Sequence, residues 1–263
     1  MSAVKRNNAS IKGKGTQVML FAHGFGCDQN MWRYVTPAFE ADYKIVLLDH
    51  VGAGNSDHTA YCPEKYSQLE GYAADIVGIC EEMNLEEVIF VGHSVSSVIG
   101  IIAYLQAPHL FKSLIMVGPS PSYMNEGEYV GGFTQEQITE LLESLDNNHL
   151  GWSVAMAPVI MANPERGELA EELANSFCRT NPEIAKQFAR TTFLSDSRDL
   201  LPRVKIPALI LQCSEDVIAP EEVGVYMHQN IKDSQLVLME ATGHCPNLSA
   251  PEETVRAMKQ FLA

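Results

Sequence analysis

The sequence is poor in basic residues and contains no long hydrophobic run. Lys and Arg number 18 against 33 Asp and Glu, which gives a formal net charge of −15. Lys and Arg never occur in a run longer than two, so we expect neither nucleic acid nor an anionic membrane surface as a partner. The N-terminus MSAVKRNNASIKGKG lacks the apolar region of a secretory signal, and no apolar run approaches the roughly 18 residues that span a bilayer.

Paired cysteines and metal-binding motifs are also missing. The six cysteines are scattered, with no Cys-x-x-Cys pair, which fits a reducing cytoplasm. Without His-x-x-x-His or clustered Asp, we expect no metal and no cofactor. The segment DHVGAGNSD after a strand-like run suggests a dinucleotide fingerprint. Asp57 stands where that fingerprint has its third glycine and no helix begins there, so we interpret the segment as a structural turn.

Six apolar runs rich in β-branched residues predict buried strands. Each run is continuous rather than alternating, which is typical of strands covered by helices on both faces. The runs are 17–24, 44–50, 87–94, 113–120, 208–213 and 235–240. Helical patterns lie between them at 69–84, 95–106, 221–229 and 252–262. This alternation predicts an α/β fold with a mostly parallel sheet.

Residues 121–201 interrupt the alternation, because they show only helical periods. Turn signals at Asn147, Asn163 and Thr180 divide the stretch into about four short helices. We predict a helical cap inserted between two core segments, 1–120 and 202–263. Such a cap would cover the C-terminal edge of the sheet, where open α/β sheets bind ligands.

The sequence Gly92-His93-Ser94-Val95-Ser96 joins a predicted strand directly to a predicted helix. A Gly-x-Ser-x-small pattern at such a junction is typical of a nucleophile elbow, whose sharp turn exposes the serine hydroxyl. Ser96 replaces the usual second glycine but is still small. The alternative is that Ser94 only caps the helix. We favour the elbow because strand, turn and helix all fall where the motif requires them.

A serine nucleophile needs a base, and the base needs an acid to orient it. His244 lies in the loop after the last predicted strand, and Asp216 follows the strand at 208–213. Both therefore belong to the same edge of the sheet as Ser94. Glu215 is an alternative acid, although we favour Asp216.

Two backbone N–H groups are expected to stabilise a developing oxyanion. Val95 provides one, directly after the serine. Phe25 provides the other, in the glycine-flanked turn that follows the first strand.

With these residues identified, the chain resembles the α/β-hydrolases over nearly its whole length. It is most similar to the branch that contains the bacterial stress-response regulator RsbQ and the plant karrikin and strigolactone receptors. The similar stretches include HGFGCDQNMW, LLDHVGAGNSD, GHSVSS, MVGPSPSYMN, YVGGF and GHCPNLSAPEE. YMHQ and GHCP look more like RsbQ-type members, whereas the Val95-Ser96 elbow looks more like the receptors.

The resemblance implies a V-shaped cap of four helices over a deep apolar pocket. It also implies a triad of Ser94, Asp216 and His244, with Phe25 and Val95 as oxyanion donors. By position along the cap, the implied pocket residues are Tyr123, Phe133, Trp152, Met156 and Phe193, although each could instead be core packing within the cap. RsbQ-like proteins act with a phosphatase that carries a PAS sensor domain, which makes such a phosphatase a candidate partner.

The sequence thus predicts a cytoplasmic serine hydrolase that cleaves a small, largely apolar ester or lactone through an acyl-enzyme. The resemblance adds a signalling or stress-regulator role. The alternative is a ligand sensor whose hydrolysis is slow or incidental and whose cap is recognised by a partner protein. Perhydrolase or lyase chemistry on the same triad is a third reading, without a feature of its own.

Overall fold

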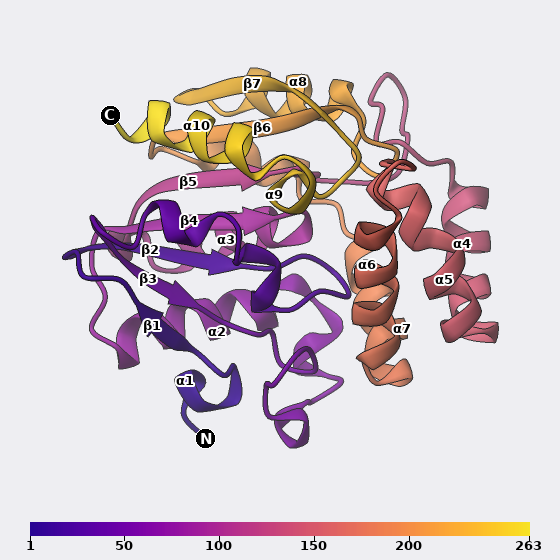
Figure 1. The fold of residues 1–263 in the computed structure, drawn as a ribbon, viewed down its shortest axis with the longest axis horizontal. Coiled ribbons are helices and arrows are strands. Elements are labelled where there is room, and N and C mark those ends of the chain that lie inside the picture. The colour runs from indigo at the N-terminus through magenta and orange to yellow at the C-terminus, as the bar shows by residue number, and fades with distance from the viewer.

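The computed structural model describes residues 1–263 and contains one seven-stranded sheet (Figure 1). The strands are β1 (Ser10–Lys12), β2 (Gln17–Ala22), β3 (Tyr43–Leu47), β4 (Val88–His93), β5 (Phe111–Val117), β6 (Ala208–Glu215) and β7 (Ser234–Thr242). Their order is β1-β3-β2-β4-β5-β6-β7. All neighbours are parallel except β1 and β3, which are antiparallel. The predicted α/β fold with a mostly parallel sheet is confirmed.

The four core helices predicted from the sequence are present, with ends that differ by at most two residues. They are α2 (Leu69–Glu82), α3 (Val95–Gln106), α8 (Glu221–Asn230) and α10 (Pro251–Leu262). The structure adds two helices of four residues each, α1 (Ala3–Arg6) and α9 (Pro246–Ser249), which the sequence did not predict. None of the helices is both long and apolar enough to cross a bilayer.

Helices cover both faces of the sheet, which explains the continuous apolar strands. In β2, Val18 and Leu20 belong to the apolar cluster that contains α2, α3 and α8. Met19 and Phe21 point to the other face and belong to a second cluster, which includes Met258 of α10. All four β2 side chains are buried. Because alternate residues meet different layers, neither face of the strand is polar.

Four helices form a cap beside the C-terminal edge of the sheet, at the right of Figure 1. They are α4 (Gln135–Asn147), α5 (His149–Met161), α6 (Gly167–Arg179) and α7 (Pro182–Phe193), all within the predicted insert. The Thr134 hydroxyl and the Gln137 side chain form a reciprocal capping box at the start of α4. Asn181 caps α7, and Pro182 takes its first helical position.

The cap shares its apolar core with the sheet. Its side chains belong to the same buried cluster as Met19 and Phe21, and they include Ile138 of α4, Trp152 of α5 and Leu173 of α6. A movement of the cap would therefore expose apolar surface on both parts.

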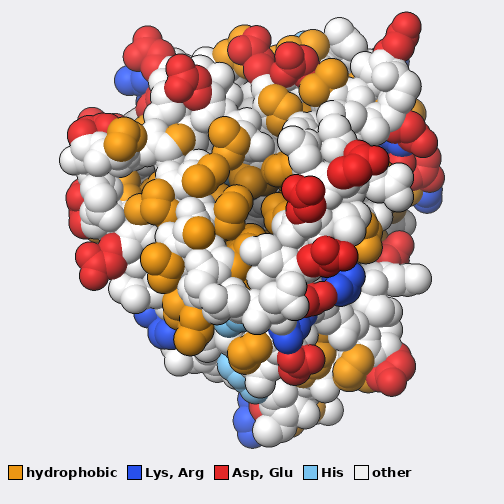
Figure 2. All heavy atoms as spheres, turned by 90° about the vertical axis from the view of Figure 1, so that its right-hand side faces the viewer, with side chains coloured by type: hydrophobic (Ala, Val, Ile, Leu, Met, Phe, Trp, Pro, Cys, Tyr) orange, Lys and Arg blue, Asp and Glu red, His pale blue; other side chains and the backbone are white.

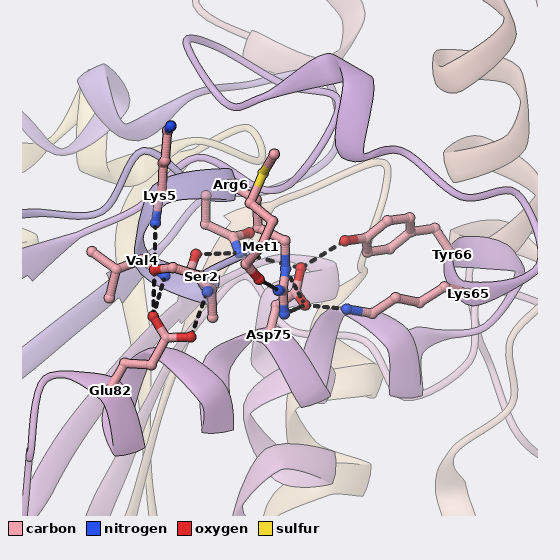
Figure 3. A network of polar contacts seen from close by, with 11 residues as sticks. Met1, Ser2, Val4, Lys5, Arg6, Lys65, Tyr66, Asp75 and Glu82 are labelled. Atoms are coloured by element: carbon pink, nitrogen blue, oxygen red, sulfur yellow. Dashed lines mark hydrogen bonds and ion pairs between the residues drawn. The ribbon is translucent and has the colours of Figure 1, made fainter.

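The short helix α1 is held by carboxylates of α2 (Figure 3). The buried Asp75 carboxylate binds four side chains, those of Arg6, Asn7, Lys65 and Tyr66. Glu82 is the last residue of α2, and its carboxylate accepts the backbone N–H groups of Ala3 at 2.6 Å and Val4 at 3.2 Å. The N-terminal partners, residues 3–7, lie about 70 to 80 residues away from these carboxylates in the chain, so local sequence patterns do not reveal this helix.

The segment DHVGAGNSD forms a turn that is closed by its own aspartate. The Asp49 carboxylate accepts the backbone N–H groups of Gln29 at 2.8 Å and Asn55 at 2.9 Å. Gly54 has a φ of +52°, and a Cβ there would lie 2.5 Å from the Asp49 carboxyl carbon. The glycine therefore serves the packing of this turn.

Candidate active site

Ser94 lies between β4 and α3 in a strained turn. Its φ of 57° and ψ of −127° are unfavourable for a residue with a side chain. The Ser94 N–H donates to the Val117 carbonyl of β5 at 2.8 Å, which holds the turn against the neighbouring strand. A Cβ at Gly92 would lie 2.5 Å from the Ser96 carbonyl oxygen, so a side chain does not fit there. Strand, turn and helix together place the Ser94 side chain at the C-terminal edge of the sheet.

A continuous chain of hydrogen bonds runs from Ser94 through His244 to Asp216. The Ser94 Oγ lies 2.7 Å from His244 Nε2, and His244 Nδ1 lies 2.6 Å from Asp216 Oδ2. All three residues are buried. If His244 donates its Nδ1–H to the carboxylate, its Nε2 is free to accept the serine proton.

Asp216 and its neighbour Glu215 have different surroundings. The second Asp216 oxygen accepts the backbone N–H groups of Ile218 at 2.8 Å and Ala219 at 3.1 Å. The Glu215 side chain is exposed, and that residue contributes only its carbonyl, which accepts the N–H of Gly243 at 3.0 Å. The structure therefore brings Asp216, and not Glu215, to His244.

The loop that carries His244 is also bound to the cap. The His244 N–H donates to the Ile160 carbonyl near the end of α5 at 2.9 Å. Gly243 has a φ of +77°, and a Cβ there would lie 2.0 Å from the Met161 carbonyl oxygen. The backbone of the cap thus contacts the backbone of the histidine directly.

His93 supports His244 rather than Ser94. Its Nε2–H donates to the His244 carbonyl at 2.7 Å. Burial, together with the nearby His244, lowers the pKa of His93 to about 3, so its ring stays neutral at ordinary pH. Sequence reasoning did not find this contact, because it joins residues 151 positions apart.

A narrow apolar cavity lies over Ser94 and His244. Sixteen residues line it, of which twelve are hydrophobic. The volume within which the centre of a water molecule can lie is about 30 Å³. That space holds only two or three waters. A ligand larger than this requires the cap or its side chains to move.

Four of the five predicted pocket residues lie on the cavity wall, namely Tyr123, Trp152, Met156 and Phe193. The Tyr123 hydroxyl is 3.4 Å from Ser94 Oγ, and burial raises the pKa of this tyrosine. Phe133 is not on the wall. Its ring packs against Phe193, with ring centres 6.1 Å apart.

Further wall residues were not predicted as pocket residues, and they include Leu141, Ile160, Leu173, Phe177, Thr192 and Ile218. The helical periods in residues 121–201 place Leu141, Leu173 and Phe177 on buried helix faces. They do not say which buried residues border a cavity and which pack without a gap.

Phe25 and Val95 lie next to the serine. The Phe25 ring packs against the rings of Trp152 and Phe193, and its backbone N–H has no acceptor in the protein. A Cβ at the preceding Gly24 would lie 3.1 Å from Ser94 Cβ, which shows how closely this loop approaches. Val95 provides the first N–H of α3, and the first N–H groups of a helix have no partner within it.

Comparison with known proteins shows the family of this chain. Residues 17–251 match the alpha/beta hydrolase fold family. The chain is 38% identical to a karrikin insensitive 2 receptor from Petunia hybrida over 97% of its length and 95% of the receptor. It is 32% identical to a strigolactone esterase from Arabidopsis thaliana, over 97% of this chain and 96% of the esterase.

A solved structure of a hydrolase from Oleispira antarctica is similar throughout. Its TM-score is 0.96 at 43% identity, and the match covers 99% of this chain and 96% of that one. Both the fold and the family are therefore established by comparison.

Proposed function

Because the chain belongs to the α/β-hydrolase fold family and is a serine hydrolase related to the karrikin and strigolactone receptor esterases, we propose that it cleaves a small, largely apolar ester or lactone. The observation that carries the proposal is the buried chain Ser94–His244–Asp216 under a mostly apolar cavity. Apolar walls favour a substrate with few charges, because a charged group would lose its hydration there.

The proposed reaction proceeds through an acyl-enzyme. Ser94 Oγ attacks the ester carbonyl while His244 Nε2 takes the serine proton. The N–H groups of Phe25 and Val95 stabilise the oxyanion of the tetrahedral intermediate. The proton then passes to the leaving alcohol, and water releases the acid by the same steps in reverse. Asp216 holds the His244 ring and stabilises its charged form.

The Ser94→Ala variant tests this proposal. With p-nitrophenyl acetate as substrate, kcat should fall by at least about 10⁴-fold, because the nucleophile is absent. The circular dichroism spectrum should stay unchanged. The matched control is Ser97→Ala, which removes a buried serine hydroxyl from the first turn of α3, three residues after Ser94. Wild-type turnover by Ser94→Ala would overturn the proposal.

A second candidate function is ligand sensing, with slow or incidental hydrolysis. The direct hydrogen bond between the His244 N–H and the Ile160 carbonyl favours it, because a displacement of the histidine backbone would also displace the end of α5 in the cap. Three apolar residues of α5 are well exposed, namely Leu150, Val154 and Val159. Figure 2 shows hydrophobic side chains near the centre of the face at the cap side, with acidic side chains around them.

The proposed hydrolase activity goes with an RsbQ-like signalling or stress-regulator role, for which a PAS-domain phosphatase or another signalling protein is the candidate partner. The two candidates differ in the time course of p-nitrophenol release. Repeated fast turnover with no lasting adduct supports an ordinary esterase. A burst near one equivalent, followed by a long-lived acyl mass on the chain, supports the sensor.

A further inference from the structure

A chain of buried polar groups connects the two loops that border Ser94. The Ser96 hydroxyl donates to the His23 carbonyl at 2.5 Å. His50 Nε2 lies 2.8 Å from the same hydroxyl and therefore donates to it, since the Ser96 proton is already used. All three residues are buried, at 0%, 0% and 1% exposure for Ser96, His23 and His50.

The His23 side chain closes the network. Its Nε2 accepts the backbone N–H of His50 at 3.0 Å, and its Nδ1 donates to the Gly24 carbonyl at 2.8 Å. The rings of His23 and His50 are also in edge contact, with centres 4.7 Å apart. Burial lowers the pKa of both histidines, so both rings stay neutral and keep these donor and acceptor roles.

The network lies between the two proposed oxyanion donors. Ser96 directly follows Val95, and His23 lies two residues before Phe25. The bond from Ser96 Oγ to the His23 carbonyl therefore links the first turn of α3, which carries the Val95 N–H, to the loop that carries the Phe25 N–H. The Phe25 loop has other contacts, since the Gly24 carbonyl accepts the Cys27 N–H at 3.3 Å and the Gly26 carbonyl accepts the Ser176 hydroxyl at 2.7 Å. Those bonds lie within the loop or reach the cap, whereas the Ser96 bond joins the loop to the helix that begins at Val95. A glycine at position 96, as in the usual elbow motif, could not make this bond.

We propose that Ser96 and His50 are positioning residues, which hold the Phe25 N–H in place for the oxyanion through the His23 carbonyl. This inference rests on the proposed function. Neither residue lines the cavity over Ser94. The departure of the elbow from its usual glycine is, on this account, the feature that makes the loop rigid.

A small alkyl trifluoromethyl ketone measures the effect directly. Its carbonyl carbon bonds to Ser94 Oγ, the serine proton moves to His244, and the carbonyl oxygen becomes an oxyanion, so its affinity reports on the donors. The corresponding methyl ketone, which lacks fluorine and adds poorly, reports on the cavity alone.

In Ser96→Ala, we expect the inhibition constant of the trifluoromethyl ketone to rise by about tenfold. This is less than the 10²- to 10³-fold loss on removing a donor, because the Phe25 N–H is displaced and not deleted. For p-nitrophenyl acetate, kcat should fall by a similar factor with KM unchanged. The methyl ketone should bind as it does to the wild type.

Ser97→Ala is the matched control, because Ser97 is equally buried on the same helix and its hydroxyl donates to the Gly92 carbonyl at 2.9 Å. We expect its inhibition constants to stay within about twofold, within the range of an ordinary buried-hydroxyl change. Equal weakening of the trifluoromethyl ketone in Ser96→Ala and Ser97→Ala would overturn the positioning role.

If Ser96→Ala does not fold, two variants of His50 test the same positioning role. His50→Gln retains an N–H donor near Ser96 and should bind the trifluoromethyl ketone like the wild type. His50→Phe keeps a ring but loses the donor and should bind it several-fold more weakly. Equal affinity in both variants would contradict a role for His50. Failure of the proposed function looks different, since Ser94→Ala would then keep its activity.

Discussion

At the scale of single residues, burial separates side chains that have the same chemistry. Asp216 and Glu215 are adjacent carboxylates at the C-terminal end of β6, but only Asp216 is buried and bonded to His244. The sequence predicted Ser94 and His244 and favoured Asp216 as the acid, because the order of the three residues along the chain and the ends of the predicted strands can both be recognised from sequence patterns. It could not reveal His93 beneath His244, because that contact depends on how two distant loops meet.

Asp216→Asn should lower kcat for p-nitrophenyl acetate by about 10⁴-fold, because an amide favours the wrong His244 tautomer and does not balance the imidazolium. Glu215→Gln changes the same atoms one residue earlier and should stay within about twofold. Steady-state kinetics on both variants checks this. A large loss in Glu215→Gln with little loss in Asp216→Asn would reverse the assignment of the acid.

At the scale of elements, helical periodicity identified the cap but not its lining. The capping box at Thr134 and the Pro182 start of α7 are local signals, and the structure follows them. Strand β1 has no such signal, since it is three residues long and mostly exposed. It exists through its antiparallel pairing with β3. Local sequence patterns do not predict elements that form through tertiary contacts of this kind.

Helix α5 offers a direct test of the cavity wall. Met156 lines the cavity, whereas Leu150 on the same helix is 58% exposed. Met156→Ala should widen the site and raise kcat/KM for p-nitrophenyl hexanoate relative to the acetate by about tenfold, the usual range for a change of pocket size. Leu150→Ala should leave that ratio unchanged. An equal change of this ratio in both variants would contradict the claim that Met156 lines the substrate cavity.

At the scale of the whole molecule, buried neutral histidines tie stability to pH. Burial lowers the pKa of His23, His50 and His93 below the usual 6.5, for His93 to about 3. Below pH 6.5 the unfolded chain therefore binds more protons than the folded one. The free energy of unfolding must then fall as pH falls from 6.5 toward 3.

We expect Tm to decrease between pH 7 and pH 5, before most carboxylates take up protons. His93→Gln should make this decrease shallower, because it removes one group that is protonated only in the unfolded state. His58→Gln changes an exposed histidine and should keep the wild-type slope. Differential scanning calorimetry across this range measures it. A Tm that is constant from pH 7 to 5 would contradict neutral burial of these rings.

The central claim is that Ser94 carries the acyl group. The most direct measurement is to mix the wild-type protein with p-nitrophenyl acetate, quench with acid within the first turnover, digest the chain and locate the acetyl group by mass spectrometry. The account predicts acetylation of the peptide that contains Ser94, at its hydroxyl, and none in Ser94→Ala. Acetylation at another residue, with Ser94 unmodified while p-nitrophenol is released, would contradict it.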